Sequence, residues 1–182
     1  DFDTAKSRFS RLASLASELG DEKLTANAHY GIARVALAEG QTEVARDHLE
    51  LALGGYVRVG HRSNQALALL CRGVLAIAEA DDAAAERCLS KALSLAREAG
   101  EAMDESCILR CLGDVEAGRG NYAAARVLLR DSLLSNVHSD DMLEVALGLR
   151  SAAMLSFREG DFGHGATLLG AVQRAGAAVE RL

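Results

Sequence analysis

The feature that most constrains this chain is a short phrase that recurs at a regular interval. Its copies begin at Glu39, Glu79, Arg119 and Glu159. Each copy has a charged residue, then glycine or alanine, and a small residue five positions after that. Self-similarity with a period of about 40 residues is typical of stacked helical hairpins, in which each hairpin buries its apolar face against its neighbours. Such a stack usually serves as a surface that holds another molecule.

The composition favours helices throughout. Proline is absent from the 182 residues, so no proline removes a backbone donor from a helix interior. Apolar residues make up 49% of the chain and aromatic residues only 4%, which predicts a core built mainly from alanine and leucine. Alanine loses no side-chain entropy in a helix and is the strongest helix former. The sequence therefore predicts an all-α protein.

The glycine of the recurring phrase marks a tight turn between two helices. Gly40, Gly120 and Gly160 each follow one apolar-periodic run and precede another. A helix commonly ends in a left-handed residue, which glycine adopts without steric cost, and Ala80 takes that place in the second copy. Because the turn is short, the flanking helices are expected to be antiparallel neighbours.

Small and large residues occupy fixed positions on both sides of the turn. In the second helix of each hairpin a small residue precedes a large apolar one by four positions, in the pairs Ala45/Leu49, Ala85/Leu89, Ala125/Leu129 and Gly165/Leu169, with Ala5/Phe9 at the start. In the first helix the small residues share a face with the residues four positions earlier, in the pairs Ala33/His29, Gly73/Leu69, Gly113/Leu109 and Ala153/Leu149. We expect the small residues to let helices approach closely and the large ones to fill the gap between hairpins.

These patterns predict about nine antiparallel helices and one continuous repeat domain over residues 1–182. The helices are expected near residues 2–19, 21–39, 42–58, 62–79, 82–99, 102–119, 122–136, 140–159 and 162–181. They group into a half repeat at 1–20 and hairpins at 21–60, 61–100, 101–140 and 141–182. Because the chain opens with the pattern of a second helix, we expect it to be a segment of a longer protein.

The pattern resembles the tetratricopeptide repeat (TPR). Leu112-Gly113 matches the Leu-Gly pair of that motif, and Ala5/Phe9 matches its Ala-x3-Phe element. The motif's Trp and closing Pro are missing, and the period is about 40 residues where the motif has about 34. HEAT and armadillo repeats have periods of about 40–47 residues and are the alternative. The resemblance implies a TPR-like α-α superhelix, a solenoid whose helices are longer than usual.

A narrower resemblance lies in the amino-acid sequences of residues 92–100, 121–129 and 166–171. These segments are similar to the MalT-like C-terminal arrays of large bacterial regulators, especially actinobacterial ones. Those proteins join an ATPase core to a LuxR-type or AfsR-type DNA-binding domain. The phrase Leu168-Leu169-Gly170-Ala171 tends to close such arrays. The resemblance implies a sensor that takes an inducer or partner and passes a signal to those parts, although kinases and cyclases carry similar arrays.

Charge and hydropathy exclude several classes of function. The net charge is −6 with no basic block, which argues against direct binding of nucleic acid, because neutralised phosphates supply most of that affinity. No apolar run approaches the ~20 residues that span a bilayer, and no signal peptide opens the chain. The four cysteines lie inside predicted helices, as in a reduced, cytoplasmic protein.

No arrangement of reactive residues predicts an enzyme, a metal site or a cofactor. Cys71, Cys107 and Cys111 could approach one another, but they lack a fourth ligand at a zinc-site spacing and are expected to be small buried thiols. The five histidines are scattered, without a carboxylate and nucleophile at regular spacing. The glycine-rich stretch 160–165 follows a helix and lacks the Gly-Lys-Ser/Thr ending of a phosphate loop, so it is interpreted as a turn.

The first helices of a TPR array line its concave surface, and the resemblance implies which residues lie there. An apolar middle formed by Leu67, Leu70 and Val74 would be flanked by arginines, whose planar guanidinium groups suit carboxylates and amide oxygens. The alternative is that these arginines pair with neighbouring acids or face water. The full set is Asn27, Tyr30, Arg34, Leu67, Leu70, Val74, Cys107, Arg110, Asp114, Leu147, Arg150 and Met154.

We therefore expect a protein- or ligand-binding sensor or scaffold module of a cytoplasmic signalling or transcriptional regulator. Its concave face would hold an extended or helical peptide of a protein partner, or an acidic small-molecule effector. One alternative is an oligomerisation scaffold without a dedicated ligand, which would form a homo-oligomer through the exposed ends of the stack. The other alternative is a HEAT-like adaptor.

Overall fold

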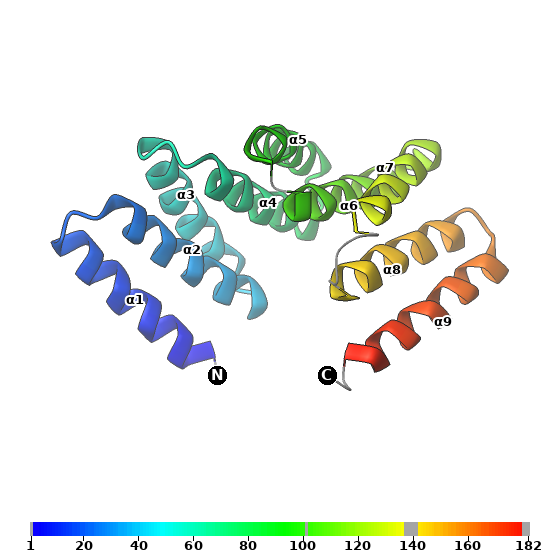
Figure 1. Ribbon diagram of the computed structural model, residues 1–182, viewed down its shortest axis with the longest axis horizontal. Coiled ribbons are helices and arrows are strands. Elements are labelled where there is room, and N and C mark those ends of the chain that lie inside the picture. The colour runs from blue at the N-terminus through cyan, green and yellow to red at the C-terminus, as the bar shows by residue number, and fades with distance from the viewer. Residues whose placement is uncertain (1, 101, 137–141, 180–182) are drawn as a thin grey trace. The chain divides into compact units, whose positions relative to one another are not determined.

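The computed structural model describes residues 2–100, 102–136 and 142–179, and these contain nine α-helices and no strand (Figure 1). Each predicted helix end that falls in these ranges lies within one residue of the observed end. The predicted ends at 140 and 181 lie outside the described residues. The helices are α1 (Phe2–Glu18), α2 (Glu22–Ala38), α3 (Thr42–Arg58), α4 (Arg62–Ala78), α5 (Asp82–Ala99), α6 (Ala102–Gly118), α7 (Tyr122–Ser135), α8 (Met142–Arg158) and α9 (Phe162–Val179).

The turns have the left-handed geometry that the sequence predicts. Gly40, Gly120 and Gly160 have φ angles of +72°, +82° and +85°, and Ala80 adopts the same conformation at +59°. In each of these turns the backbone folds back onto the helix that has just ended. At the first turn, for example, the N–H of Gln41 donates to the carbonyl of Ala36 over 2.8 Å. This closure satisfies carbonyl groups that a helix end leaves without partners.

The chain divides into two compact units, Asp1–Ala99 with α1–α5 and Gly100–Leu182 with α6–α9. In the first unit α1 packs on α2, α2 on α3, α3 on α4 and α4 on α5. In the second unit α6 packs on α7, α8 on α9, and both α6 and α7 contact α8. The pairs α2/α3, α4/α5, α6/α7 and α8/α9 are the hairpins. A single array that runs continuously over residues 1–182 stays a prediction.

The core of the first unit is built from alanine and leucine, as the composition predicts. Leu49 of α3 is fully buried against Ala33 of α2 and Leu75 of α4. It therefore fills the space inside its own hairpin and also the gap to the next one. A second cluster joins Ala26, Ala52, Tyr56 and Ala68 of α2, α3 and α4. Burial of these side chains is the main force that holds neighbouring hairpins together.

Small residues of the first helices receive the large residues of the second helices. A Cβ added to Gly73 would lie 2.6 Å from the side chain of Leu89, and one added to Gly113 would lie 2.8 Å from Leu129. Such separations are shorter than any van der Waals contact, so the helices approach this closely only because the side chain is absent. The prediction that small residues let helices approach closely is correct for these two hairpins.

The second unit repeats the same packing with local changes. Leu129 of α7 lies in a cluster with Ala117 of α6, Ala125 of α7 and Leu155 of α8. Leu169, at the equivalent position of α9, is only half-buried. Within the part of the chain that the structure describes, none of the helices is both long and apolar enough to cross a membrane.

Candidate binding surfaces

In the first unit, helices α2 and α4 contact each other and carry six of the residues predicted to face a ligand (Figure 1). We call this set the α2–α4 face. Arg34 is exposed and Val74 is 42% exposed, whereas the other four side chains are half-buried. The face consists of Asn27, Tyr30, Arg34, Leu67, Leu70 and Val74.

The polar end of the α2–α4 face is fixed by hydrogen bonds inside the protein. The side-chain oxygen of Asn27 accepts hydrogen bonds from the Tyr56 hydroxyl over 2.9 Å and from the Asn64 amide over 3.0 Å. These bonds link α2, α3 and α4, so they hold the two hairpins in register. Sequence reasoning missed both partners. The sequence did contain a signal. The equivalent positions one repeat later hold Ala96 and Asp104, so Tyr56 and Asn64 depart from the repeat.

Tyr30 forms the centre of the α2–α4 face. The Cys71 thiol donates to the Tyr30 hydroxyl over 3.6 Å, and the Arg34 guanidinium lies 5.9 Å above the tyrosine ring. Burial raises the pKa of the Tyr30 hydroxyl and that of the Cys71 thiol, so both groups stay protonated at neutral pH. The guanidinium is held over an aromatic surface and remains open to solvent, which suits an approaching carboxylate.

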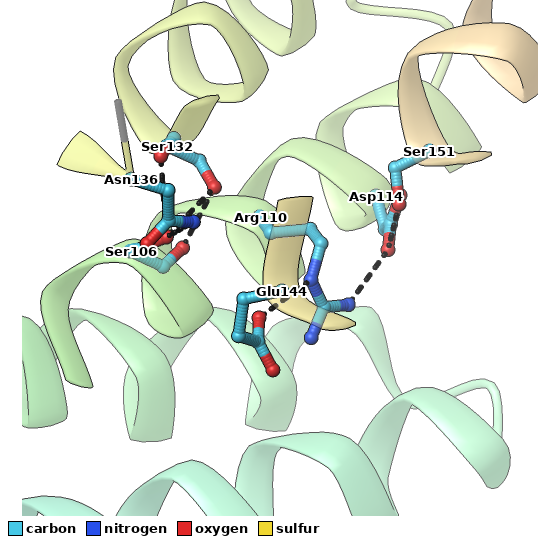
Figure 2. A network of polar contacts seen from close by, with 7 residues as sticks. All are labelled: Ser106, Arg110, Asp114, Ser132, Asn136, Glu144 and Ser151. Carbon is cyan, nitrogen blue, oxygen red and sulfur yellow. Dashed lines mark hydrogen bonds and ion pairs between the residues drawn. The ribbon is translucent and has the colours of Figure 1, made fainter. Parts of the chain in front are cut away.

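In the second unit Arg110, at the position equivalent to Tyr30, is engaged by the protein itself (Figure 2). The side chain of Arg110 is 13% exposed and lies 3.9 Å from the carboxylate of Asp114 and 3.7 Å from that of Glu144. Ser151 donates a hydrogen bond to Asp114 over 3.2 Å. Burial raises the pKa of Asp114, against the lowering by this hydrogen bond and by Arg110. Pairing with neighbouring acids is the arrangement that the sequence left open as an alternative.

The rest of the predicted set in the second unit is partly open. Met154 is 49% exposed and Arg150 is exposed, while Cys107 and Leu147 are half-buried. Burial, with the nearby carboxylate of Glu144, raises the pKa of Cys107 to about 12, so this group remains a thiol at neutral pH. The outer part of the predicted face in this unit therefore consists of one arginine and one flexible apolar side chain.

Beside Arg110 lies a buried polar cluster that sequence reasoning missed (Figure 2). Ser106 of α6 and Ser132 of α7 exchange hydrogen bonds between side chain and backbone over 3.2 and 2.9 Å, and the Asn136 amide donates to the Ser106 hydroxyl. No base lies among these three side chains to activate either hydroxyl, so the cluster acts as a cross-link between helices. The signal was available, because the equivalent positions one repeat earlier hold Ala66, Ala92 and Ala96.

A pocket of about 400 Å³ lies between α7, α8 and α9 in the second unit. Sequence reasoning missed this pocket because it placed all binding residues on first helices. We call it the α7–α9 pocket. Its apolar lining comes from Leu129, Leu133, Leu134, Ala152, Leu155 and Leu168. Its polar lining comes from Arg126, Arg130, Ser156, Glu159, Asp161 and His164.

Comparison with known proteins identifies the fold. No protein-family model matches the chain, and no curated protein sequence matches it. Among solved structures, BtubC (BKLC) from P. vanneervenii is similar with a TM-score of 0.80 and 19% identity, over 99% of this chain and 75% of that one. A putative kinesin light chain from Podosopora anserina, described as having nearly identical TPR-like repeats, is similar with a TM-score of 0.71 and 14% identity, over 100% of this chain and 89% of that one.

At sequence identities this low, the similarity shows that the backbones follow the same path, and it carries no information about partners. The second of these structures is described by its TPR-like repeats, which favours the TPR over the HEAT or armadillo alternative. The all-α fold class predicted from the repeat period is confirmed. The chain has a TPR-like helical repeat fold.

Proposed function

We propose that this chain is a protein-interaction module that holds a partner's peptide segment on the α2–α4 face. The observation that carries the proposal is that exposed Val74 and half-buried Leu67 and Leu70 lie on α4, and that the exposed guanidinium of Arg34 lies on α2, which contacts α4. An apolar strip next to an arginine fits a segment with apolar side chains and a carboxylate. The TPR-like fold supports this proposal, because stacked helical repeats present extended surfaces to partners.

The half-buried side chains of this face favour a peptide that lies on the surface over a ligand that is enclosed in a deep pocket. Leu67 and Leu70 present only part of their surface, and the hydrogen bonds of Asn27 are used within the protein. A partner therefore gains affinity mainly by covering apolar surface and by pairing with Arg34. Residues Arg150 and Met154 of the second unit belong to the same proposal as a separate contact area. Arg110 is available to a partner only if its contacts with Asp114 and Glu144 are exchanged.

The test is a selection of short peptides from a random display library on the whole chain, followed by affinity measurement on variants. Val74→Glu places a carboxylate in the strip and is expected to weaken the selected peptides at least tenfold, which corresponds to about 1.4 kcal/mol. Arg34→Gln is expected to weaken acidic peptides more than neutral ones. The expected consensus contains leucine-like residues near an aspartate or glutamate.

A matched control is available on a second helix of the same unit. Val57 of α3 is 56% exposed and lies outside the α2–α4 face. Val57→Glu adds the same charge to the same unit and is expected to leave peptide affinity within about twofold, as is normal for surface substitutions. Equal loss in both variants, or no loss in either, would contradict the proposal.

We also place the module in a cytoplasmic transcriptional regulator, as the resemblance of residues 92–100, 121–129 and 166–171 implies. Binding of an inducer or partner would then shift the population of two arrangements of the larger protein. The sequence that adjoins this chain in its gene tests the idea. A phosphate-binding loop and a helix-turn-helix in one protein would support it. A kinase domain would change the output but keep the sensor role, and the absence of all three would end it.

One observation favours a second function, a scaffold that associates with copies of itself. Helix α1 exposes Phe2 by 51% and Leu15 by 47%, and Leu12 of the same helix lines a shallow apolar hollow. Exposed apolar patches often mark contacts between proteins. Sedimentation equilibrium of the chain tests this function. A dimer that the Leu15→Glu substitution dissociates supports the scaffold. A chain that stays monomeric at the highest concentration at which it is soluble contradicts it.

A further inference from the structure

The α7–α9 pocket has a counterpart in the first unit, at the equivalent positions two repeats earlier in the chain. There Arg46 of α3 pairs with Glu79 at the end of α4, and in the second unit Arg126 of α7 pairs with Glu159 at the end of α8. Leu75 and Leu155 lie at the floor of the two hollows. The repeat therefore builds the same groove twice, which allows the two copies to be compared position by position.

The two grooves differ in what fills them. In the first unit Arg72 lies in the groove and reaches toward Glu50 of α3, at 3.7 Å, and the hollow has a volume of about 180 Å³. In the second unit the equivalents of this pair are Ala152 and Arg130, and the volume is about 400 Å³. Ala152 in place of Arg72 removes one long side chain from the second groove, which is the larger of the two. The larger of these two volumes lies within the range of small-molecule sites.

The open groove is apolar inside. Leu129 and Leu155 form its floor, with exposures of 2% and 4%, and half-buried Leu133 and Leu168 form its walls. Leu134 at the rim is 59% exposed. Water in such a cavity finds few partners, so an apolar group that displaces it gains free energy.

The charges around the groove select one kind of ligand. Arg126 is already bound by Glu159, and the Asp161 carboxylate accepts a hydrogen bond from the backbone of His164. Arg130 stands one helical turn farther along α7 and forms an ion pair with its chain neighbour Asp131 at 2.9 Å. The two side chains of that pair are 65% and 43% exposed, so the pair is weak and a ligand can replace it.

We propose that the α7–α9 pocket binds a small amphipathic monocarboxylate, with its apolar body on the leucine floor and its carboxylate on Arg130. A second anionic group at the other end of the ligand would meet the carboxylates of Glu159 and Asp161, which disfavours dicarboxylates. This site lies in the second unit and does not depend on the α2–α4 face. The inference goes beyond the interaction module proposed above.

The test uses the whole chain and decanoate as the probe, by isothermal titration at concentrations below micelle formation. Decanoate is expected to bind at least tenfold more tightly than decylammonium of the same length, with 1-decanol between them. Shortening the acid by one methylene is expected to weaken binding by about fourfold. Equal binding of all three head groups, or no binding of decanoate up to its solubility limit, would overturn the proposal.

Variants that copy the first unit locate the binding. Ala152→Arg combined with Arg130→Glu reproduces the Arg72/Glu50 pair, which the same fold accommodates in the first unit, and is expected to weaken decanoate at least tenfold. Arg130→Gln alone should remove the preference for the acid while decanol still binds. Arg87→Gln, which removes an exposed arginine from α5, is the control for net charge and should leave the affinity for decanoate unchanged.

Circular dichroism and the melting temperature show whether each variant is folded. Unchanged decanoate affinity in a folded double variant would overturn the site. Val74→Glu, which tests the α2–α4 face, should leave decanoate binding unaffected, so failure of either proposal can be told from failure of the other. An acetylated leucine tripeptide with a free carboxyl end is the last probe. Tighter binding of this peptide than of decanoate would reject a small-molecule ligand in favour of a protein C-terminus.

Discussion

At the scale of single residues, the exception in the turns is more informative than the rule. Ala80 adopts φ +59°, a conformation that costs a residue with a Cβ about 1–2 kcal/mol relative to a right-handed one. Gly40 occupies the equivalent turn at +72°, with no atom within 4 Å of an added Cβ. A methyl group added at Gly40 would therefore meet no neighbour, and its cost would be that of the left-handed backbone conformation alone.

We predict that Ala80→Gly raises the free energy of unfolding by about 0.5–1 kcal/mol, because relief of the left-handed strain exceeds the added freedom of the unfolded chain. Gly40→Ala should lower the free energy of unfolding by a similar amount. Urea denaturation with a constant slope measures both changes. A loss of stability in Ala80→Gly would show that the methyl group of Ala80 contributes a contact.

A second departure from the repeat introduces a titratable side chain, that of His29. His29 stands where the other repeats have Leu69, Leu109 and Leu149, and its Nδ1 lies 3.0 Å from that of His48. Burial, together with the neighbouring His48, lowers the pKa of His29. Burial also lowers the pKa of His48, with Lys6 acting in the same direction and Asp47 against it. The hydrogen bond between the rings needs an unprotonated Nδ1 on one of them.

Because the folded protein binds these protons less readily than the unfolded chain, its stability should be full above the ordinary histidine pKa of about 6.5 and fall as the pH drops below it. His29→Leu restores the residue of the other repeats and should make the chain more stable and less sensitive to pH in this range. Urea denaturation at pH 7.5 and 5.5 measures the effect. A pH dependence identical to that of the parent chain would contradict this role of His29.

At the scale of helices, the small residues that determine how closely two helices pack are those that face the neighbouring helix. Gly54 and Gly55 are neighbours in α3, but only Gly55 faces α2, where an added Cβ would lie 2.7 Å from the Cβ of Ala26. At Gly54 the nearest atom is an Arg58 side-chain nitrogen at 3.5 Å, an ordinary contact. The sequence could not distinguish these two glycines, because helical periodicity alone does not state how closely two backbones approach.

We predict opposite effects from the same substitution at these adjacent sites. Gly54→Ala should raise the free energy of unfolding by about 0.5–1 kcal/mol, because alanine is the better helix former. Gly55→Ala should lower the free energy of unfolding by about 1–3 kcal/mol through overpacking against α2. Thermal unfolding of the two variants side by side tests the packing. Stabilisation by both would mean that α2 and α3 are farther apart than described.

Helix positions were predictable because the turn residue, the small residue and the large residue recur together. Alanine at 45, 85 and 125 is completely buried, as the repeat requires. The polar cluster of Ser106, Ser132 and Asn136 was not predicted, since it depends on which positions of two helices face each other. Arg110 shows the same limit: the repeat register placed it correctly on a first helix but could not show its enclosure by Asp114 and Glu144.

At the scale of the whole molecule, a repeat predicts where equivalent surfaces lie, and differences between copies predict which surface is used. The α2–α4 face was named from the register alone, and its role in binding remains a proposal. The register did not predict the α7–α9 pocket, because the pocket depends on differences between equivalent grooves, among them Ala152 in place of Arg72. Comparing repeats that are two apart locates this substitution in the sequence, but the volume of the groove depends on the three-dimensional packing.

The central claim is that a partner's peptide lies on the α2–α4 face, and NMR of methyl-labelled protein tests it most directly. A peptide selected on the protein is expected to shift the methyl signals of Leu67, Leu70 and Val74 most strongly and in proportion to saturation. Shifts confined to second-helix methyls, such as those of Leu51 and Val57, which are 53% and 56% exposed, would contradict the account.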